Sequence, residues 1–183
     1  MKQMLLLFFF VIAASFVRAQ DDAQKAFNEG VKLLKANKFS EAERKFSVAI
    51  KKGVAAQGLK MSYIYKGFSL NGQEKYDDAI VCFTKAIEID PVDPASYTDR
   101  GIAYSYKKDY NNAVKDFQKV LKIDSIDKQA EAAYYYLGRI SSLQVEFQQA
   151  ISYLDILLKL VPTDYEGYFL RWTAKGNMMH IKG

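Results

Sequence analysis

The residues that could carry out chemistry in this chain are few and scattered. Its 183 residues contain one histidine, His180, and one cysteine, Cys82. The usual zinc sites take four ligands, mostly histidine and cysteine, so two such residues cannot build one. No glycine-rich phosphate-binding loop is present. An enzyme would need a nucleophile with a base, a metal cluster or a cofactor loop. We therefore predict no catalytic residue, no metal site, no cofactor and no enzymatic activity.

Paired acidic residues are the remaining candidates for chemistry. Asp77 and Asp78 fall where we expect a helix to begin, and negative charge there is stabilised by the helix dipole. The segment 90–93, Asp-Pro-Val-Asp, offers oxygen atoms that could bind calcium loosely, and it equally matches an ordinary turn between repeats. The structural interpretation is the one we favour for both pairs.

The elements that would position any functional residue come from an internal repeat. Four glycines lie 37, 34 and 37 residues apart, and an aromatic residue follows each by nine positions. Small and large apolar residues then recur at steps of three and four, which places them on one face of an α-helix. Each unit is predicted to be a helical hairpin that buries its apolar stripe by stacking on its neighbours. The glycines are Gly30, Gly67, Gly101 and Gly138, and the aromatic residues are Phe39, Tyr76, Tyr110 and Phe147.

This pattern resembles the tetratricopeptide repeat. The stretch 79–91, Ala-Ile-Val-Cys-Phe-Thr-Lys-Ala-Ile-Glu-Ile-Asp-Pro, is similar to the family's second helix with its terminating proline. The resemblance implies an all-α fold, a right-handed α-solenoid of antiparallel helix hairpins. We expect a domain over 20–183 with repeats at about 23–56, 60–93, 94–127 and 131–164, followed by a C-terminal capping helix at 164–177 that ends at Gly176-Asn177. The alternative for this last helix is a docking patch formed by Phe169, Trp172 and Met178-Met179.

The resemblance also implies where a partner would bind, because the first helices of tetratricopeptide repeats line a concave groove. An apolar groove rich in tyrosine suits an extended peptide or an amphipathic helix. The alternative is that some of these side chains, above all Ile64, Phe68 and Ile102, pack as core. The candidate groove residues are Phe27, Val31, Ile64, Tyr65, Phe68, Asn71, Asp99, Ile102, Tyr135, Tyr136, Arg139 and Phe169.

One well-known partnership of the family is not supported. Family members that grip the acidic tails of heat-shock chaperones do so with lysine and asparagine side chains in this groove. The matching positions here hold Phe27, Val31, Tyr65, Ala95 and Asp99. The chain therefore lacks the clamp for a terminal carboxylate.

The first residues have the anatomy of a secretory signal peptide. Lys2 precedes an apolar run from Met4 to Ala14, and Val17-Arg18-Ala19 offers small residues for cleavage between Ala19 and Gln20. The run is shorter than the roughly 20 residues that span a bilayer. We predict a signal peptide at 1–19 and an exported protein of the bacterial type, periplasmic or secreted, with no stable membrane span. An uncleaved anchor is the alternative.

The net charge and the predicted export together limit the classes of partner. The formal net charge is +5, and the lysines of the first repeat are mixed with glutamates, as on solvated helix faces. Nucleic acid is a poor partner for an exported protein, so we expect protein partners of the envelope or of secretion. The sequence predicts a protein-binding scaffold. The alternatives are a subunit that self-associates through its terminal helices or Cys82, and a carrier or accessory subunit for an apolar ligand or an enzyme.

Overall fold

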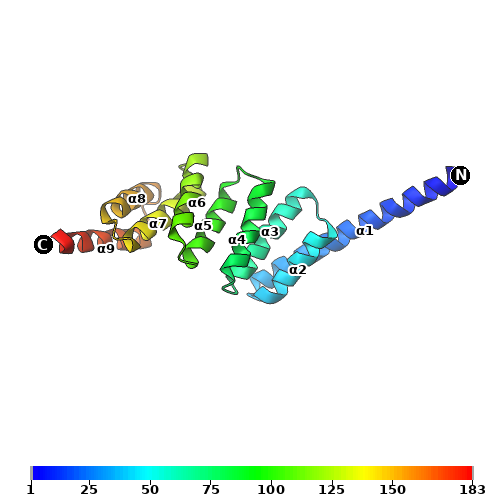
Figure 1. Ribbon diagram of the computed structural model, residues 1–183, viewed down its shortest axis with the longest axis horizontal. Coiled ribbons are helices and arrows are strands. Elements are labelled where there is room, and N and C mark those ends of the chain that lie inside the picture. Colours follow the sequence, from blue (N-terminus) through cyan, green and yellow to red (C-terminus); the bar gives the residue numbers. More distant parts are fainter. Residues whose placement is uncertain (1, 183) are drawn as a thin grey trace. The chain divides into compact units, whose positions relative to one another are not determined.

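The regular structure of the described chain is entirely α-helical. The computed structural model describes residues 2–182, with side chains at 17–55 and 57–180, and in this range it contains nine helices and no strand (Figure 1). The chain divides into two compact units, Met1–Pro91 and Val92–Gly183. Most of the predicted signal peptide at 1–19 lies outside the residues with described side chains, and it stays a prediction.

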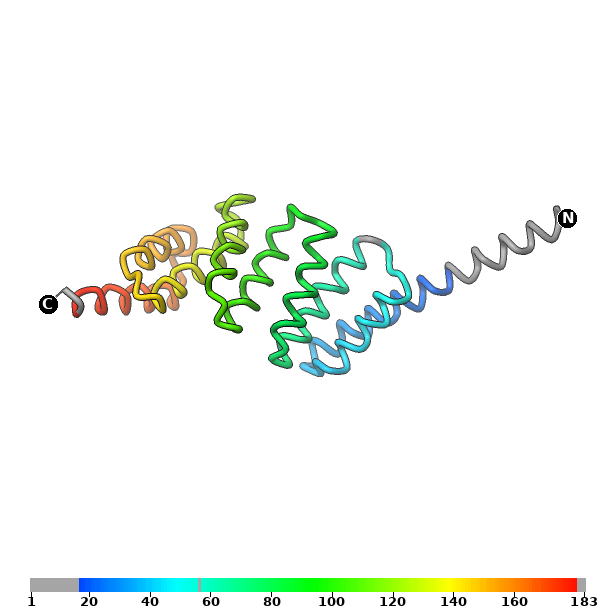
Figure 2. The backbone as a smooth tube through the Cα atoms, in the orientation of Figure 1, coloured from blue at the N-terminus to red at the C-terminus, as the bar shows by residue number. Residues whose placement is uncertain are grey.

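Unit 1 consists of two helical hairpins. The short turn at 36–38 joins α1 to α2, and the turn at 72–75 joins α3 to α4 (Figure 2). Helix α3 contacts both helices of the first hairpin as well as its own partner. The helices are α1 (Lys2–Lys35), α2 (Phe39–Lys52), α3 (Ala56–Asn71) and α4 (Tyr76–Ile89).

Unit 2 has two hairpins and one further helix. Helix α7 contacts both helices of the hairpin before it, and α9 packs on both α7 and α8. The Asp127 carboxylate accepts hydrogen bonds from the backbone N–H groups of Gln129 and Ala130, and so caps α7. The helices are α5 (Pro94–Tyr106), α6 (Tyr110–Ile123), α7 (Lys128–Leu143), α8 (Phe147–Leu160) and α9 (Tyr165–Lys182).

The repeated glycines sit where the two helices of each hairpin cross. A Cβ atom on Gly67 would lie 2.6 Å from the ring of Phe83, which is fully buried. Gly138 makes the same approach to Leu154, with 2.7 Å to its Cγ. Only glycine permits this distance, because any larger residue would overlap the buried side chain. Unit 2 matches unit 1 at an offset of 71 positions, since Gly101 and Gly138 follow Gly30 and Gly67 by that number.

Every hairpin turns through one residue in the left-handed region. Asn37, Glu74, Lys108 and Val145 hold φ values of 56°, 59°, 64° and 66° at matched places in the four turns. Asparagine tolerates this conformation, whereas the branched side chain of valine is strained in it. All four turns keep this conformation, even where the residue is poorly suited to it.

The prediction that the last helix ends at Gly176-Asn177 is wrong. Helix α9 continues to Lys182, and Gly176 does not adopt the left-handed conformation of a helix C-cap. A single glycine inside a helix costs only about 1 kcal/mol relative to alanine. Beyond Gly176, Met178 packs against the buried residues Ala150 and Ile151 of α8, and this contact stabilises the last turns of α9.

Within the part of the chain that the structure describes, no helix combines the length and apolarity needed to cross a membrane.

Candidate functional site

The predicted groove residues of unit 1 form a ladder of aromatic rings. Phe27 and Tyr65 lie with ring centroids 5.7 Å apart, and Tyr65 lies 5.7 Å from the buried Phe46. Phe68 continues the ladder, 5.7 Å from the buried Phe83. Phe27, Tyr65 and Phe68 are half-buried, and each of them packs against a buried phenylalanine of the core.

The other candidates of unit 1 differ in exposure. Ile64 is only 6% exposed and belongs to the core. Val31 is half-buried. The Oδ1 atom of Asn71 is buried and accepts no hydrogen bond from the described residues, so it is an acceptor without a donor.

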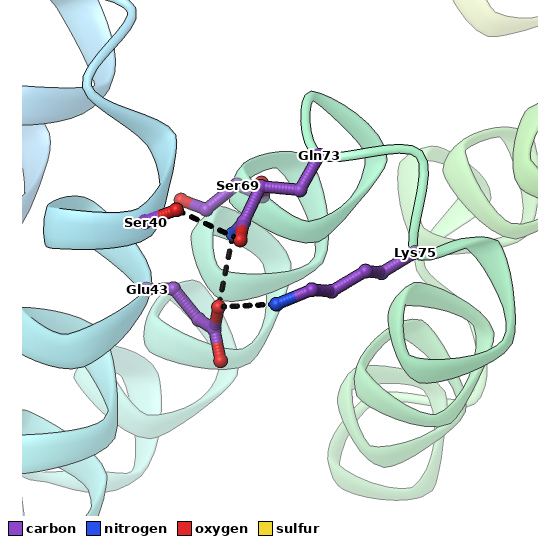
Figure 3. Close-up of polar contacts among 5 residues, drawn as sticks. All are labelled: Ser40, Glu43, Ser69, Gln73 and Lys75. Atoms are coloured by element: carbon purple, nitrogen blue, oxygen red, sulfur yellow. Dashed lines mark hydrogen bonds and ion pairs between the residues drawn. The ribbon is translucent and has the colours of Figure 1, made fainter.

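A polar cluster fixes α2 to the turn between α3 and α4. The amide of Gln73 donates to the Glu43 carboxylate and its oxygen accepts from the Ser40 hydroxyl, both at 2.9 Å (Figure 3). The same amide donates to the carbonyl of Ser69 at 3.1 Å, and Lys75 Nζ lies 3.7 Å from Glu43 Oε2. We call these five residues the clasp.

The two units differ in the cavity beside this joint. In unit 1 a cavity of about 260 Å³ remains, lined by Glu43, Lys66, Leu70, Asp78, Val81 and Cys82. In unit 2 the matched cavity measures about 510 Å³ and extends over the positions that the clasp occupies in unit 1. It is lined by Asn111, Val114, Lys115, Leu137, Ser141, Gln144, Glu146 and Gln149.

Two of the predicted groove residues of unit 2 lie together on α7. The ring of Tyr136 stacks on the buried Phe117 at 5.2 Å, and Tyr135 meets Tyr136 edge to face at the same distance. The Tyr135 hydroxyl donates to Glu166 Oε1 at 2.5 Å. Burial and this hydrogen bond to a carboxylate raise the pKa of Tyr135, so its hydroxyl stays protonated and oriented towards α9.

These tyrosines line a cavity between α7, α9 and the end of α8. Its volume is about 320 Å³, enough for one or two side chains of a bound peptide. Its charged lining residues are three acids and one lysine. The residues are Lys128, Glu131, Ala132, Tyr135, Tyr136, Leu157, Val161, Asp164 and Glu166.

The remaining candidates of unit 2 do not line this cavity. Ile102 is half-buried and packs against the core cluster around Phe117, and Arg139 is exposed. Asp99 is half-buried, and desolvation followed by the nearby charge of Asp93 raises its pKa to about 7. Phe169 is 63% exposed on α9.

Sequence reasoning missed the ion pairs that join the two helices of a hairpin, and two of them occupy matched positions in the two units. Lys45 Nζ lies 2.5 Å from Glu29 Oε2, and Arg100 binds Asp116 through two bonds of 2.8 Å. Each pair spans 16 positions, and that shared spacing with opposite charges was the available signal. The matched position in the second hairpin holds Cys82, which is 6% exposed and whose pKa desolvation raises to about 11.

Over the described residues, no group of three or more histidine, cysteine, aspartate or glutamate side chains is placed to hold a metal ion.

Comparison with known proteins accounts for the repeated hairpins. The family model of the tetratricopeptide repeat matches two consecutive segments, 61–93 and 94–126. The chain contains tetratricopeptide repeats. A comparison with curated protein sequences gives no match. The division of the whole chain into four tetratricopeptide repeats stays a prediction.

Solved structures with similar folds include tetratricopeptide repeat proteins. The first tetratricopeptide domain of Spaghetti (RPAP3), bound to the HSP90 peptide SRMEEVD, is 24% identical with a TM-score of 0.62, covering 66% of this chain and 93% of that one. MamA from Desulfovibrio magneticus RS-1 is 17% identical with a TM-score of 0.70, covering 80% and 79%. YrrB, described as having an unusual peptide-binding site, is 19% identical with a TM-score of 0.70, covering 84% and 74%. These likenesses confirm the fold class, an all-α solenoid of helical hairpins.

Proposed function

We propose that this chain is a non-catalytic scaffold of the cell envelope. It binds a segment of a partner protein along the first helix of each of its hairpins. The observation that carries the proposal is the cavity between α7 and α9. Tyr135 and Tyr136, two groove positions of the repeat family, line it together with Leu157 and Val161. Tyrosine gives a large contact area at low entropic cost and a polar tip for orientation, which suits protein recognition.

The lining of the cavity indicates the chemistry of the partner segment. Its apolar wall accepts an aliphatic or aromatic side chain. Glu131, Asp164 and Glu166 oppose the single cation Lys128, so the charge around the cavity favours a segment with lysine or arginine beside its apolar residue. We propose a short basic and apolar segment, bound as an extended peptide or one face of a helix.

This chemistry differs from that of some structural neighbours. The RPAP3 domains are seen with the acidic peptides SRMEEVD and SGPTIEEVD of HSP90 and HSP70. Three carboxylates at the cavity would repel such a peptide. A chaperone tail is therefore not the partner that we propose.

The envelope part of the proposal is supported by the N-terminal sequence alone. A basic start, an apolar run and small residues before Gln20 are the features of an export signal. Partners would then be envelope or secretion proteins.

A selection from a displayed peptide library tests the binding mode. The target is the protein obtained by expressing the full chain, and the matched variants are Ala132→Glu and Gln148→Glu. Ala132 lines the cavity, so a glutamate there fills it, whereas Gln148 is an exposed residue of α8 outside it. Both variants add one negative charge, so their comparison separates filling of the cavity from a change in net charge.

The proposal expects enriched peptides that pair an apolar residue with lysine or arginine. Their binding should fall at least about tenfold with Ala132→Glu and stay unchanged with Gln148→Glu. Circular dichroism checks that both variants are helical. Enrichment of acidic tails, or equal binding to both variants, would show that this cavity is not the binding site.

A further inference from the structure

Helix α9 carries an exposed apolar stripe. Its buried face, with Gly167 and Ala174, packs on α8. On the opposite face Tyr165, Trp172 and Met179 are 86%, 73% and 68% exposed. These three residues are seven positions apart, or two helical turns, so they lie in one row about 21 Å long. An isolated exposed apolar residue is ordinary, but a continuous row along a helix is typical of a contact surface.

The stripe is not the first half of an incomplete hairpin. In each of the four hairpins a glycine lets the second helix approach, and in unit 2 these are Gly101 and Gly138. Trp172 follows Gly138 by 34 positions and occupies the glycine's place in α9. The indole would block the close crossing of another hairpin helix. Any helix that covers α9 must pack at the wider distance that large side chains require.

We propose that α9 pairs with α9 of a second copy of this chain, antiparallel and with the two-fold axis at Trp172. The stripe is symmetric about this residue, because Tyr165 and Met179 lie seven positions to either side. Antiparallel pairing therefore sets each tyrosine against the partner's methionine at both ends, with the two indoles at the centre. A sulfur atom beside an aromatic ring is a favourable contact. Such self-complementarity is what a two-fold interface requires.

The polar residues beside the stripe complement one another in the same register. In an antiparallel pair each flank of a helix faces the same flank of its copy. Helical spacing places Glu166 and His180 on one flank, at opposite ends, so the acid of one copy faces the imidazole of the other. On the other flank Lys175 faces the ring of Tyr168, which is 47% exposed, in a cation–π arrangement. In a parallel pair each flank would face the opposite flank of the copy at the same height, so Glu166 and His180 would not meet.

The interface consists of one helix from each copy, so it falls in the small class. Interfaces of that size are transient and exchange readily. Glu166 belongs both to this flank and to the lining of the cavity between α7 and α9, where it accepts the Tyr135 hydroxyl. Trp172 does not line that cavity, so its substitution tests self-association apart from partner binding.

Tryptophan fluorescence reports on the proposed interface directly, because Trp172 is the only tryptophan of the chain. We expect its emission to shift to shorter wavelength as the concentration of the protein expressed from the full chain rises. The mass from light scattering should rise towards twice that of the monomer over the same range. Emission and mass that do not change with concentration would overturn the proposal. A blue shift produced only by vesicles of anionic lipid would also overturn it, in favour of a membrane-binding helix.

Disulfide trapping tests the register. In a Cys82→Ser background, Tyr165→Cys and Met179→Cys leave the central tryptophan in place. Mixing the two proteins under mild oxidation should give a linked heterodimer, and Gln148→Cys on α8 should give none. Addition of Trp172→Glu, whose helicity is checked by circular dichroism, should lower the linked fraction about 30-fold, as expected of a central aromatic residue. Trapping of Tyr165→Cys mainly with itself would show parallel pairing, and an unchanged yield with Trp172→Glu would show chance collision.

Discussion

The two units place their polar contacts differently on one shared frame. Glu29–Lys45 in unit 1 and Arg100–Asp116 in unit 2 occupy matched positions, and the order of their charges is reversed. The side chains of the first pair are 38% and 44% exposed, whereas those of the second are 19% and 7% exposed. The hairpin accepts either order because only the complementarity of the two charges matters, but burial makes one pair far more costly to break.

At the joints between hairpins, it is unit 1 that has the stronger polar contacts. Unit 1 closes its joint with the clasp around Glu43 and Gln73 (Figure 3). In unit 2 the position of Glu43 holds Val114, the position of Lys75 holds Glu146, and a cavity of about 510 Å³ lies there. Unit 1 thus has a polar network at its surface joint that unit 2 lacks. Each unit also has an ion pair with a buried member inside a hairpin, Lys60–Asp90 in unit 1 and Arg100–Asp116 in unit 2. The glycine crossings set the frame, and the polar contacts vary upon it.

The largest effect is expected from breaking the buried ion pair. Asp116→Ala would leave the Arg100 guanidinium buried without its bidentate carboxylate, at a cost of about 4 kcal/mol in the free energy of unfolding. Urea unfolding followed by circular dichroism measures this cost. Lys45→Ala is the matched change in unit 1 and should have a small effect, because water already reaches both side chains of its pair. Equal losses from the two variants would show that burial does not distinguish the pairs.

A glycine crossing tests the frame that both units share. Gly67→Ala would press a methyl group into the ring of Phe83, and overpacking of this kind costs about 3 kcal/mol. Gly138→Ala meets a leucine instead of a ring, and a branched aliphatic side chain can change rotamer where a buried ring cannot, so its cost should be lower. Thermal unfolding of the two variants measures the difference. A Gly67→Ala protein as stable as the parent would mean that the close approach does not hold the hairpin together.

The hairpins could be predicted from the sequence because their glycine and aromatic spacing is strictly local. The same reasoning could not separate core from surface among the groove aromatics. Tyr136 is half-buried against Phe117, whereas Phe169, another predicted groove residue, is 63% exposed. The difference depends on contacts with other helices, which the local pattern does not contain. The end of α9 was missed because a local C-cap signal at Gly176 was outweighed by packing of Met178, a tertiary contact. The cavity between α7 and α9 likewise exists only once three helices are assembled.

Asp99 gives the two units a different dependence on pH. Its pKa is raised to about 7 from a usual value near 4, so the folded state favours the protonated form. In the unfolded chain this carboxyl ionises near pH 4, so the stability from its protonated folded form is present below about pH 4, falls between about pH 4 and 7, and is lost above that. The drop should be about 2 kcal/mol, allowing for partial solvent access. The matched residue in unit 1 is Asn28, which cannot ionise.

Asp99→Asn places the asparagine of unit 1 at the matched position of unit 2. It should remove the fall in the free energy of unfolding over this pH range. The stability difference between the variant and the parent should increase with pH across the window. Chemical unfolding at several pH values measures it, and Asn28→Asp at an exposed position is the control that adds a carboxylate without burial. Parallel profiles for the parent and Asp99→Asn would exclude the carboxylate as their cause.

The smallest effect is expected at the joint, where the two units offer one glutamine each. Gln73→Ala removes three hydrogen bonds of the clasp, to Ser40, Glu43 and the carbonyl of Ser69. Water replaces most of them at this surface, so the loss should be about 1 kcal/mol. Gln144→Ala, the matched change in unit 2, removes a side chain that lines the larger cavity and should be nearly neutral. Hydrogen exchange at the amides of α2 and α3 provides the second measurement, because loosening of the joint should raise exchange there and leave α6 and α7 unchanged. If Gln73→Ala left the exchange of the α2 and α3 amides as slow as in the parent, the clasp would fill space without fixing the joint.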